Sequence, residues 1–274
     1  MGKNINKAFY RYFVKGFCEK LQQIPNEYHP ESGIFIPYTF NNYAKAEKKI
    51  FFVGIDSAGW IKTSEMLNDY SNNDIDSYLE KNSKVVTVQG KNQDGTDCHS
   101  LKENSSWNRD LMSCFWPFCQ KLYIYIITGE WVDIAKFEQR HYDLLEGAAY
   151  GNQSLVEIKK GWLEKVHKYK GNSKLVKELH TYVNEMEKLE NIFNAYDVPD
   201  LVIILGQRGR RDILNGLGAT LINSNEYADV FDMERYPTKI IWTSHPSARK
   251  KRAFRQEILP ALGDTARKLL GLIE

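Results

Sequence analysis

A short apolar run that ends in a tight turn constrains this chain more than any other stretch. Residues Phe51 to Trp60 read FFVGIDSAGW, and the apolar run before Gly54 is long enough for a buried parallel strand but too short for a helix. Asp56 follows among small residues. Such a turn places the carboxylate at the carboxyl edge of a sheet, where open α/β sheets hold their ligands. The alternative is that Asp56 only caps the next helix.

The length and composition favour a soluble globular protein. The chain has 274 residues, enough for one large domain or two small ones, with 42% hydrophobic and 26% charged residues. It has no apolar run near the roughly 20 residues that cross a bilayer, and its first residues lack the apolar core of a signal peptide. We therefore expect a cytoplasmic protein without a membrane partner, and a monomer.

The cysteines do not predict a metal site. Cys18, Cys98, Cys114 and Cys119 form no CxxC pair, and no histidine completes a ligand set. An iron–sulfur cluster held by all of them has no support in their spacing. We expect buried thiols in a reducing compartment, and no cofactor.

The charge is nearly balanced, at a formal net +2, but basic residues gather in two places. One group contains Arg208, Arg210 and Arg211, and the other runs from Arg249 to Arg255. Basic patches that follow strands are suited to phosphates. A solvated basic helix face is the alternative.

Three further stretches predict strands of the same sheet. Residues 147–158 carry Asn152, residues 200–205 read DLVIIL, and residues 238–244 read TKIIWTS and lead directly into His245. A shorter strand is predicted over residues 84–89.

Helical patterns alternate with these strands. Helices are predicted over residues 1–24, 106–125, 173–196 (capped by Ser173), 208–217 and 257–273. Alternating strands and helices predict an α/β fold, a three-layer α/β/α sandwich with a central, mostly parallel four-stranded sheet and helical insertions. We expect a single domain over residues 1–274, with a helical or loop insertion at about residues 68–145.

Polar residues lie near the ends of three predicted strands: Asp56, Asn152 and His245. Because parallel strands end at the same edge of a sheet, we expect these side chains to converge on one pocket. A carboxylate, an amide and an imidazole in one cleft are suited to binding a small polar ring or to hydrolysis without a metal.

The chain resembles the uracil-DNA glycosylase superfamily. The resemblance rests on the strand-turn GIDSAG, a later strand ending in Asn, the strand DLVIILG and above all IIWTSHPS, in that order across roughly residues 50 to 255. It implies that Asp56 orients the attacking water and stabilises positive charge on the sugar. Asn152 would read the polar edge of the extruded base, and His245 would stabilise negative charge on the departing base.

The resemblance also implies contacts to the rest of the substrate. The stacking ring would be Trp60 or Phe115, with Ser57 beside the base. Phosphate contacts are expected from Ser247, Arg249, Lys250 and Arg208, with Arg249 or a residue soon after it at the place of the wedge side chain. The partner implied is single- or double-stranded DNA that contains uracil or a modified base.

The sequence departs from the family pattern in the first motif. Ser57 stands where proline is usual, and Ala58 stands where the most uracil-specific branch has a tyrosine that rejects the methyl group of thymine. A larger or modified base is therefore also compatible with this motif.

Other functions remain open at this point. The first is a non-catalytic nucleic-acid or nucleotide binding protein with the same fold, and the second is a hydrolase that acts on free nucleosides. A doubly wound nucleotide binder is disfavoured, because the chain has neither a GxGxxG nor a Walker lysine motif.

Overall fold

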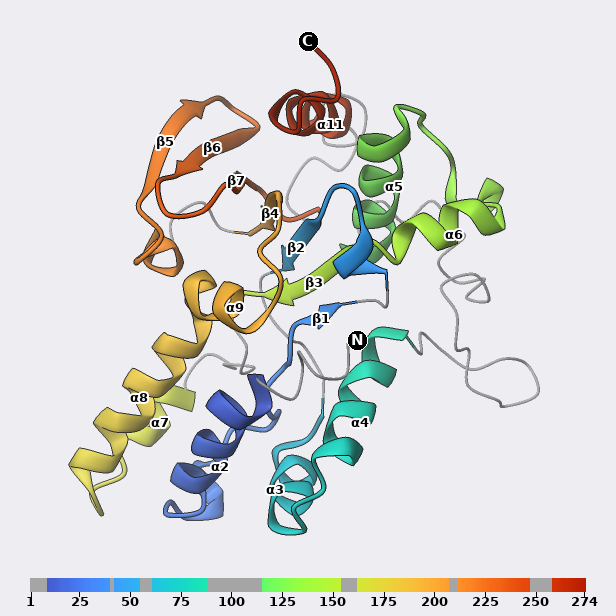
Figure 1. Ribbon diagram of the computed structural model, residues 1–274. Helices are drawn as coiled ribbons and strands as arrows, with labels where there is room; N and C mark the ends of the chain where they lie inside the picture. Colours follow the sequence, from blue (N-terminus) through green and yellow to red (C-terminus); the bar gives the residue numbers. More distant parts are fainter. Residues whose placement is uncertain are drawn as a thin grey trace.

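The four predicted apolar runs form the centre of one sheet in the computed structural model, which describes residues 9–39, 42–54, 61–87, 115–153, 162–206, 211–246 and 258–274 (Figure 1). The strands are β2 (Ile50–Gly54), β3 (Ala148–Asn152), β4 (Leu201–Leu205) and β7 (Lys239–Thr243). They lie in the order β3-β2-β4-β7, and every neighbouring pair is parallel. The predicted α/β class is confirmed.

The predicted strand number is wrong, because three antiparallel strands extend the sheet to seven. The strand β1 (Tyr38–Thr39) pairs with β3, and the hairpin of β5 (Ala219–Ser224) and β6 (Ala228–Met233) pairs with β7. The two-residue β1 is too short to leave a pattern. Five of the six β5 residues are exposed, so β5 has neither the continuous apolar run nor the alternation that predicts a strand.

Successive side chains along the central strands point to opposite faces of the sheet and pack into two separate cores. Phe51, Val202 and Trp242 belong to one core, on the face covered by α2 (Lys15–Leu21), α8 (Ser173–Glu187) and α9 (Leu189–Ala195). Phe52 and Ile203 belong to the other, against α5 (Phe115–Thr128) and α11 (Leu259–Leu269). Figure 1 shows the two groups of helices on opposite sides of the sheet. Helices on both faces explain why the central strands read as continuous apolar runs.

The remaining elements are short. The other α-helices described are α3 (Thr63–Ser71), α4 (Ile75–Thr87), α6 (Gln139–Leu145) and α7 (Trp162–His167). A π-helix spans Tyr10–Val14, and 3-10 turns span Asn26–Tyr28, Tyr43–Lys45, Ile134–Lys136 and Arg211–Leu214. Within the described ranges, no helix is both long and apolar enough to span a membrane.

The strand predicted over residues 84–89 is wrong in its described part, because residues 84–87 belong to α4. Tyr78 and Asn82 lie four residues apart and are both buried on one side of that helix. This packing overrides the β preference of Val85 and Val86.

Three predicted helices also need correction. The helix predicted over residues 173–196 is two helices, since Lys188 is extended at ψ 127°, and the side chain that caps α8 is that of Asn172 and not Ser173. The closing helix begins at Leu259, so Pro260 lies in its first turn, where proline is tolerated. The helix predicted over residues 208–217 is only a 3-10 turn in its described part.

The predicted insertion contains part of the main fold. Phe118, Leu122 and Ile126 of α5 pack with Phe52 in the core of the second face. The segment from residue 115 to 128 is therefore one of the layers that cover the sheet.

Candidate functional site

The four parallel strands end together at one edge. Gly54 of β2 pairs with Asn152 of β3, and Gln153 N donates to Gly54 O at 2.8 Å. On the other side, Gly206 N donates to Thr243 O at 2.9 Å. The residues that end or follow these strands therefore share the carboxyl edge of the sheet, where α/β proteins bind ligands.

Asn152 is held in a buried position at this edge. The residue is 7% exposed, and its Nδ2 makes no hydrogen bond within the part of the chain that the structure describes. Gly54 makes room for it, because a Cβ on Gly54 would lie 2.6 Å from Asn152 Oδ1. A buried amide hydrogen without a partner costs free energy, and such groups are rare in folded proteins. Asn152 thus presents at this edge a donor that the described residues do not satisfy.

Phe115, the first described residue of α5, lies beside Asn152. Its ring is 3.2 Å from the position that a Gly54 Cβ would occupy. The ring of Tyr150 meets it edge-on at 6.4 Å, and Tyr150 stacks in turn on Phe52 at 5.7 Å. These core rings fix the position of Phe115, so one flat apolar surface stands next to the amide.

His245 completes the group. Its ring is nearly parallel to that of Phe115, with 10° between the planes and 6.4 Å between the centroids. The end of β7 before it is tied to the hairpin, since Thr243 Oγ1 donates to Tyr227 O at 2.6 Å. Burial lowers the pKa of His245 below its ordinary value of 6.5. Burial therefore favours the neutral imidazole, which has one N–H donor and one acceptor nitrogen.

The structure thus brings together two of the site residues predicted from the sequence, Asn152 and His245. Of the two candidate stacking rings, Phe115 lies with them. The other predicted residues lie outside the described ranges: Asp56, Ser57, Trp60, Ser247, Arg249, Lys250 and Arg208.

Gln153 is a polar residue at this edge that sequence reasoning missed. It is 2% exposed, and its Nε2 has no hydrogen-bond partner among the described residues. Its amide packs over Gly206, where a Cβ would lie 2.7 Å from Nε2. The signal was the pair Asn-Gln after an apolar strand, together with a glycine at the end of the next core strand.

The described residues offer no metal site. Among them, no three His, Cys, Asp or Glu side chains gather closely enough to hold an ion. Cys18 and Cys119 are free and buried, and burial raises the pKa of Cys18 to about 12. These two thiols are packing groups, as the sequence predicted, while Cys98 and Cys114 lie outside the described ranges.

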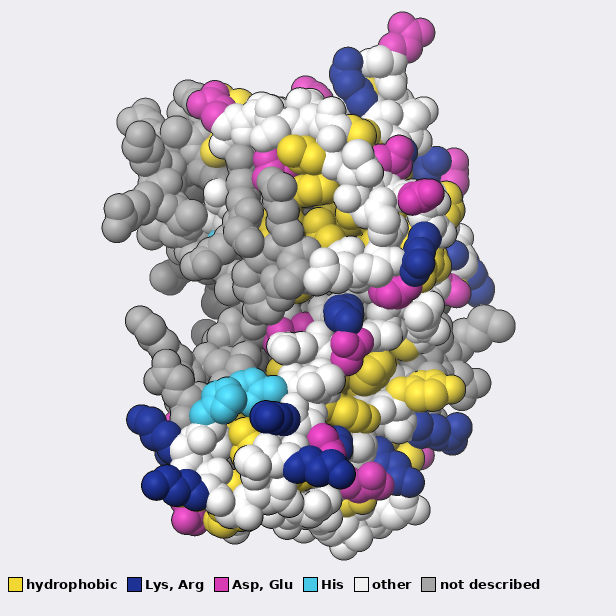
Figure 2. Space-filling view, turned by 90° about the vertical axis from the view of Figure 1, so that its left-hand side faces the viewer, with side chains coloured by type: hydrophobic (Ala, Val, Ile, Leu, Met, Phe, Trp, Pro, Cys, Tyr) yellow, Lys and Arg dark blue, Asp and Glu magenta, His cyan; other side chains and the backbone are white. Residues whose placement is uncertain are grey.

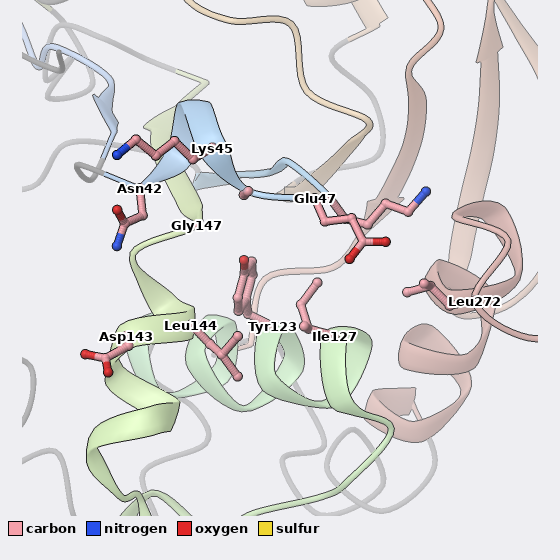
Figure 3. A pocket seen from close by; sticks show the side chains of 11 residues that line it. Asn42, Lys45, Glu47, Tyr123, Ile127, Asp143, Leu144, Gly147 and Leu272 are labelled. Atoms are coloured by element: carbon pink, nitrogen blue, oxygen red, sulfur yellow. The ribbon is translucent and has the colours of Figure 1, made fainter.

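A cavity of about 320 Å³ lies at the opposite, amino end of the sheet (Figure 3). Residues before β2 and β3, including Lys45, Glu47 and Gly147, form one side of it, and Tyr123 and Ile127 of α5 form the floor. A Cβ on Gly147 would collide with the Tyr123 hydroxyl, so the glycine admits this ring. The cavity contains none of the predicted site residues.

Comparisons of the chain with family models, with curated proteins and with solved structures found no match.

Proposed function

We propose that this protein is a DNA glycosylase-like hydrolase that cleaves the N-glycosidic bond of uracil, or of a related damaged or modified base, in DNA. The proposal joins the resemblance of its motifs to the uracil-DNA glycosylase superfamily with one observation. Asn152 Nδ2 has no hydrogen-bond partner among the described residues, and it lies beside the Phe115 ring that faces His245.

Each of these groups has a role in such a reaction. An extruded base stacks on Phe115, and the amide of Asn152 donates to its polar edge. Cleavage of the glycosidic bond leaves negative charge on the base and positive charge on the sugar. The neutral imidazole of His245 donates to the anion, and Asp56 stabilises the cation and orients the water. Preorganised donors of this kind act strongly in a site that excludes water.

The reaction also requires the base to leave the stack, which costs a few kcal/mol. Contacts to the phosphates on either side offset that cost. Ser247, Arg249, Lys250 and Arg208 are the residues proposed for these contacts, because they follow the strands that end at this edge.

The test is excision of a single uracil from labelled single- and double-stranded DNA, with alkaline cleavage of the abasic product. We expect cleavage by the wild type, and a loss of about 100- to 1,000-fold in each of the variants Asp56→Asn and His245→Ala, since each removes one charge-stabilising group. Lys268→Gln, an exposed change on α11, is the matched control and retains activity.

The alternative is a non-catalytic nucleic-acid or nucleotide binding protein with the same fold. It predicts DNA binding in low salt without cleavage, and binding that does not depend on Asp56. The absence of both cleavage and binding would contradict the proposed function in either form.

A further inference from the structure

The helices α7 and α8 carry the densest cluster of positive charge in the described chain outside the candidate site. The thirteen residues from Lys165 to Lys177 contain five lysines and one histidine, and no aspartate or glutamate. The whole chain has a net charge of only +2, so the remainder is slightly acidic. We call this cluster the α7–α8 lysine surface; its lysines are Lys165, Lys168, Lys170, Lys174 and Lys177.

All five lysines face solvent. Each is exposed, whereas Leu175, Val176 and Leu179 on the other side of α8 are buried in the core. Figure 2 views the molecule from the left-hand side of Figure 1. In its lower part, Lys and Arg side chains lie around histidine side chains. The surface is therefore a charged face with its lysines available to a partner.

The two helices form one rigid support for these lysines. The rings of His167 and His180 pack at 4.2 Å, which joins α7 to α8. Asn172 caps α8 by accepting from Leu175 N at 3.0 Å, and Trp162 Nε1 donates to Tyr28 O at 2.8 Å. These contacts join the two helices that carry the lysines to each other and to the rest of the fold.

Glu164 and Glu178 border this stretch in the sequence, and Glu178 is paired mainly with a lysine outside it. Glu178 pairs with Lys20 of α2 at 2.9 Å and reaches Lys174 only at 4.0 Å. Its side chain is 43% exposed, so the second contact is screened by water. Glu178 therefore mainly neutralises Lys20.

The surface lies around the turn between α7 and α8, at the end of α8 that is farther from the sheet (Figure 1). The helix α7 is the next described element after β3, whose last residue is Asn152. In Figure 1, α7 and α8 lie at the lower left of the view.

We propose that the α7–α8 lysine surface binds the phosphate backbone of the same DNA whose nucleotide is held at the carboxyl edge. This rests on the proposed function for its ligand, but it concerns a surface outside the catalytic group. Lysine ammonium groups that neutralise phosphates release condensed counterions, so their contribution to binding is independent of base sequence and falls with salt.

The test is the salt dependence of binding to a duplex without uracil. The variant carries Lys168→Gln, Lys170→Gln, Lys174→Gln and Lys177→Gln. Its matched control carries the same change at Lys45, Lys48, Lys136 and Lys268, which lie on other parts of the fold. The slope of log K against log salt should decrease by about 0.9 for each lysine that contacts a phosphate. At low salt we expect affinity to fall about tenfold or more, with the control near the wild type.

Two results would overturn the inference. One is a salt slope in the α7–α8 variant equal to that of the wild type. The other is an equal loss of affinity in the control variant, which would mean that only the total charge of the protein matters. Excision of uracil at saturating DNA separates this proposal from the proposed function. We expect the maximal rate of the variant to stay within about twofold of the wild type, because binding contacts made equally in the ground and transition states do not alter it. A wild type that binds DNA through this surface but excises no base would refute the proposed function, and the inference that this surface binds DNA would still hold.

Discussion

Several polar side chains at the two ends of the central sheet differ in their hydrogen bonding. At the amino end, Asp200 Oδ2 accepts from Lys49 N at 2.7 Å, and Thr238 Oγ1 donates to Pro199 O at 2.5 Å. At the carboxyl end, the buried amides of Asn152 and Gln153 each keep a nitrogen without a partner among the described residues. Polar groups that serve only the fold are normally satisfied within it. Thr39, near the start of β3, is also unpaired among the described residues, so the contrast rests on the two adjacent amides of Asn152 and Gln153, and we propose that these two serve a ligand.

The largest effect should come from Asn152→Leu at the carboxyl end. Leucine has a similar size but no amide, so the proposed hydrogen bond to the base is lost. We expect uracil excision to fall by about 100- to 1,000-fold. The free energy of unfolding is measured beside the activity, so that a loss of stability is separated from the loss of the base contact. Excision assays and urea denaturation measure the two quantities.

A matched control is Thr39→Val on β1. Thr39 Oγ1 is also buried without a hydrogen bond among the described groups, but Thr39 pairs with Ala149, away from the carboxyl edge. Thr39→Val should leave excision unchanged. Equal losses in Asn152→Leu and Thr39→Val would show that buried polarity in general, and not the position of Asn152, governs activity.

A smaller effect of the opposite kind is expected from Asp200→Ala at the amino end. The variant loses the carboxylate that accepts from Lys49 N, a bond to a charged group, and we expect about 1–3 kcal/mol less stability. The maximal rate of excision should be that of the wild type below the unfolding transition. A large fall in this rate with stability intact would abolish the contrast between the two ends.

The sequence predicts the central sheet well because its strands carry their own signal. Runs such as LVIIL of β4 are buried on both faces, so hydrophobicity alone marks them. The hairpin of β5 and β6 lacks this signal, since β5 is exposed along nearly its whole length. Its place in the sheet depends on pairing with β7 through β6, which is a tertiary interaction.

The site is predictable only where it lies at strand ends. Asn152 and His245 come directly from the rule that parallel strands end at one edge. The position of Phe115 beside Gly54 could not be predicted from sequence, because the approach of α5 to Gly54 depends on packing against Tyr150 and Phe52, whereas Trp60 lies outside the described residues. Gln153 was missed because its burial depends on Gly206 of a distant strand.

The smallest effect should be a pH dependence of stability from His245. Burial lowers its pKa below 6.5 in the folded protein, whereas the unfolded chain retains the ordinary value. Between these two values the unfolded state holds a proton that the folded state lacks, so stability falls as the pH drops through this window and levels off below it.

The variant His245→Gln lacks this titration while other groups titrate in both proteins. The free energy of unfolding of the wild type, relative to His245→Gln, should therefore decline between pH 8 and pH 5 in urea denaturation. A relative stability that rises on acidification would mean that the folded state favours the imidazolium, and His245 would then not be the neutral donor that the proposed reaction uses.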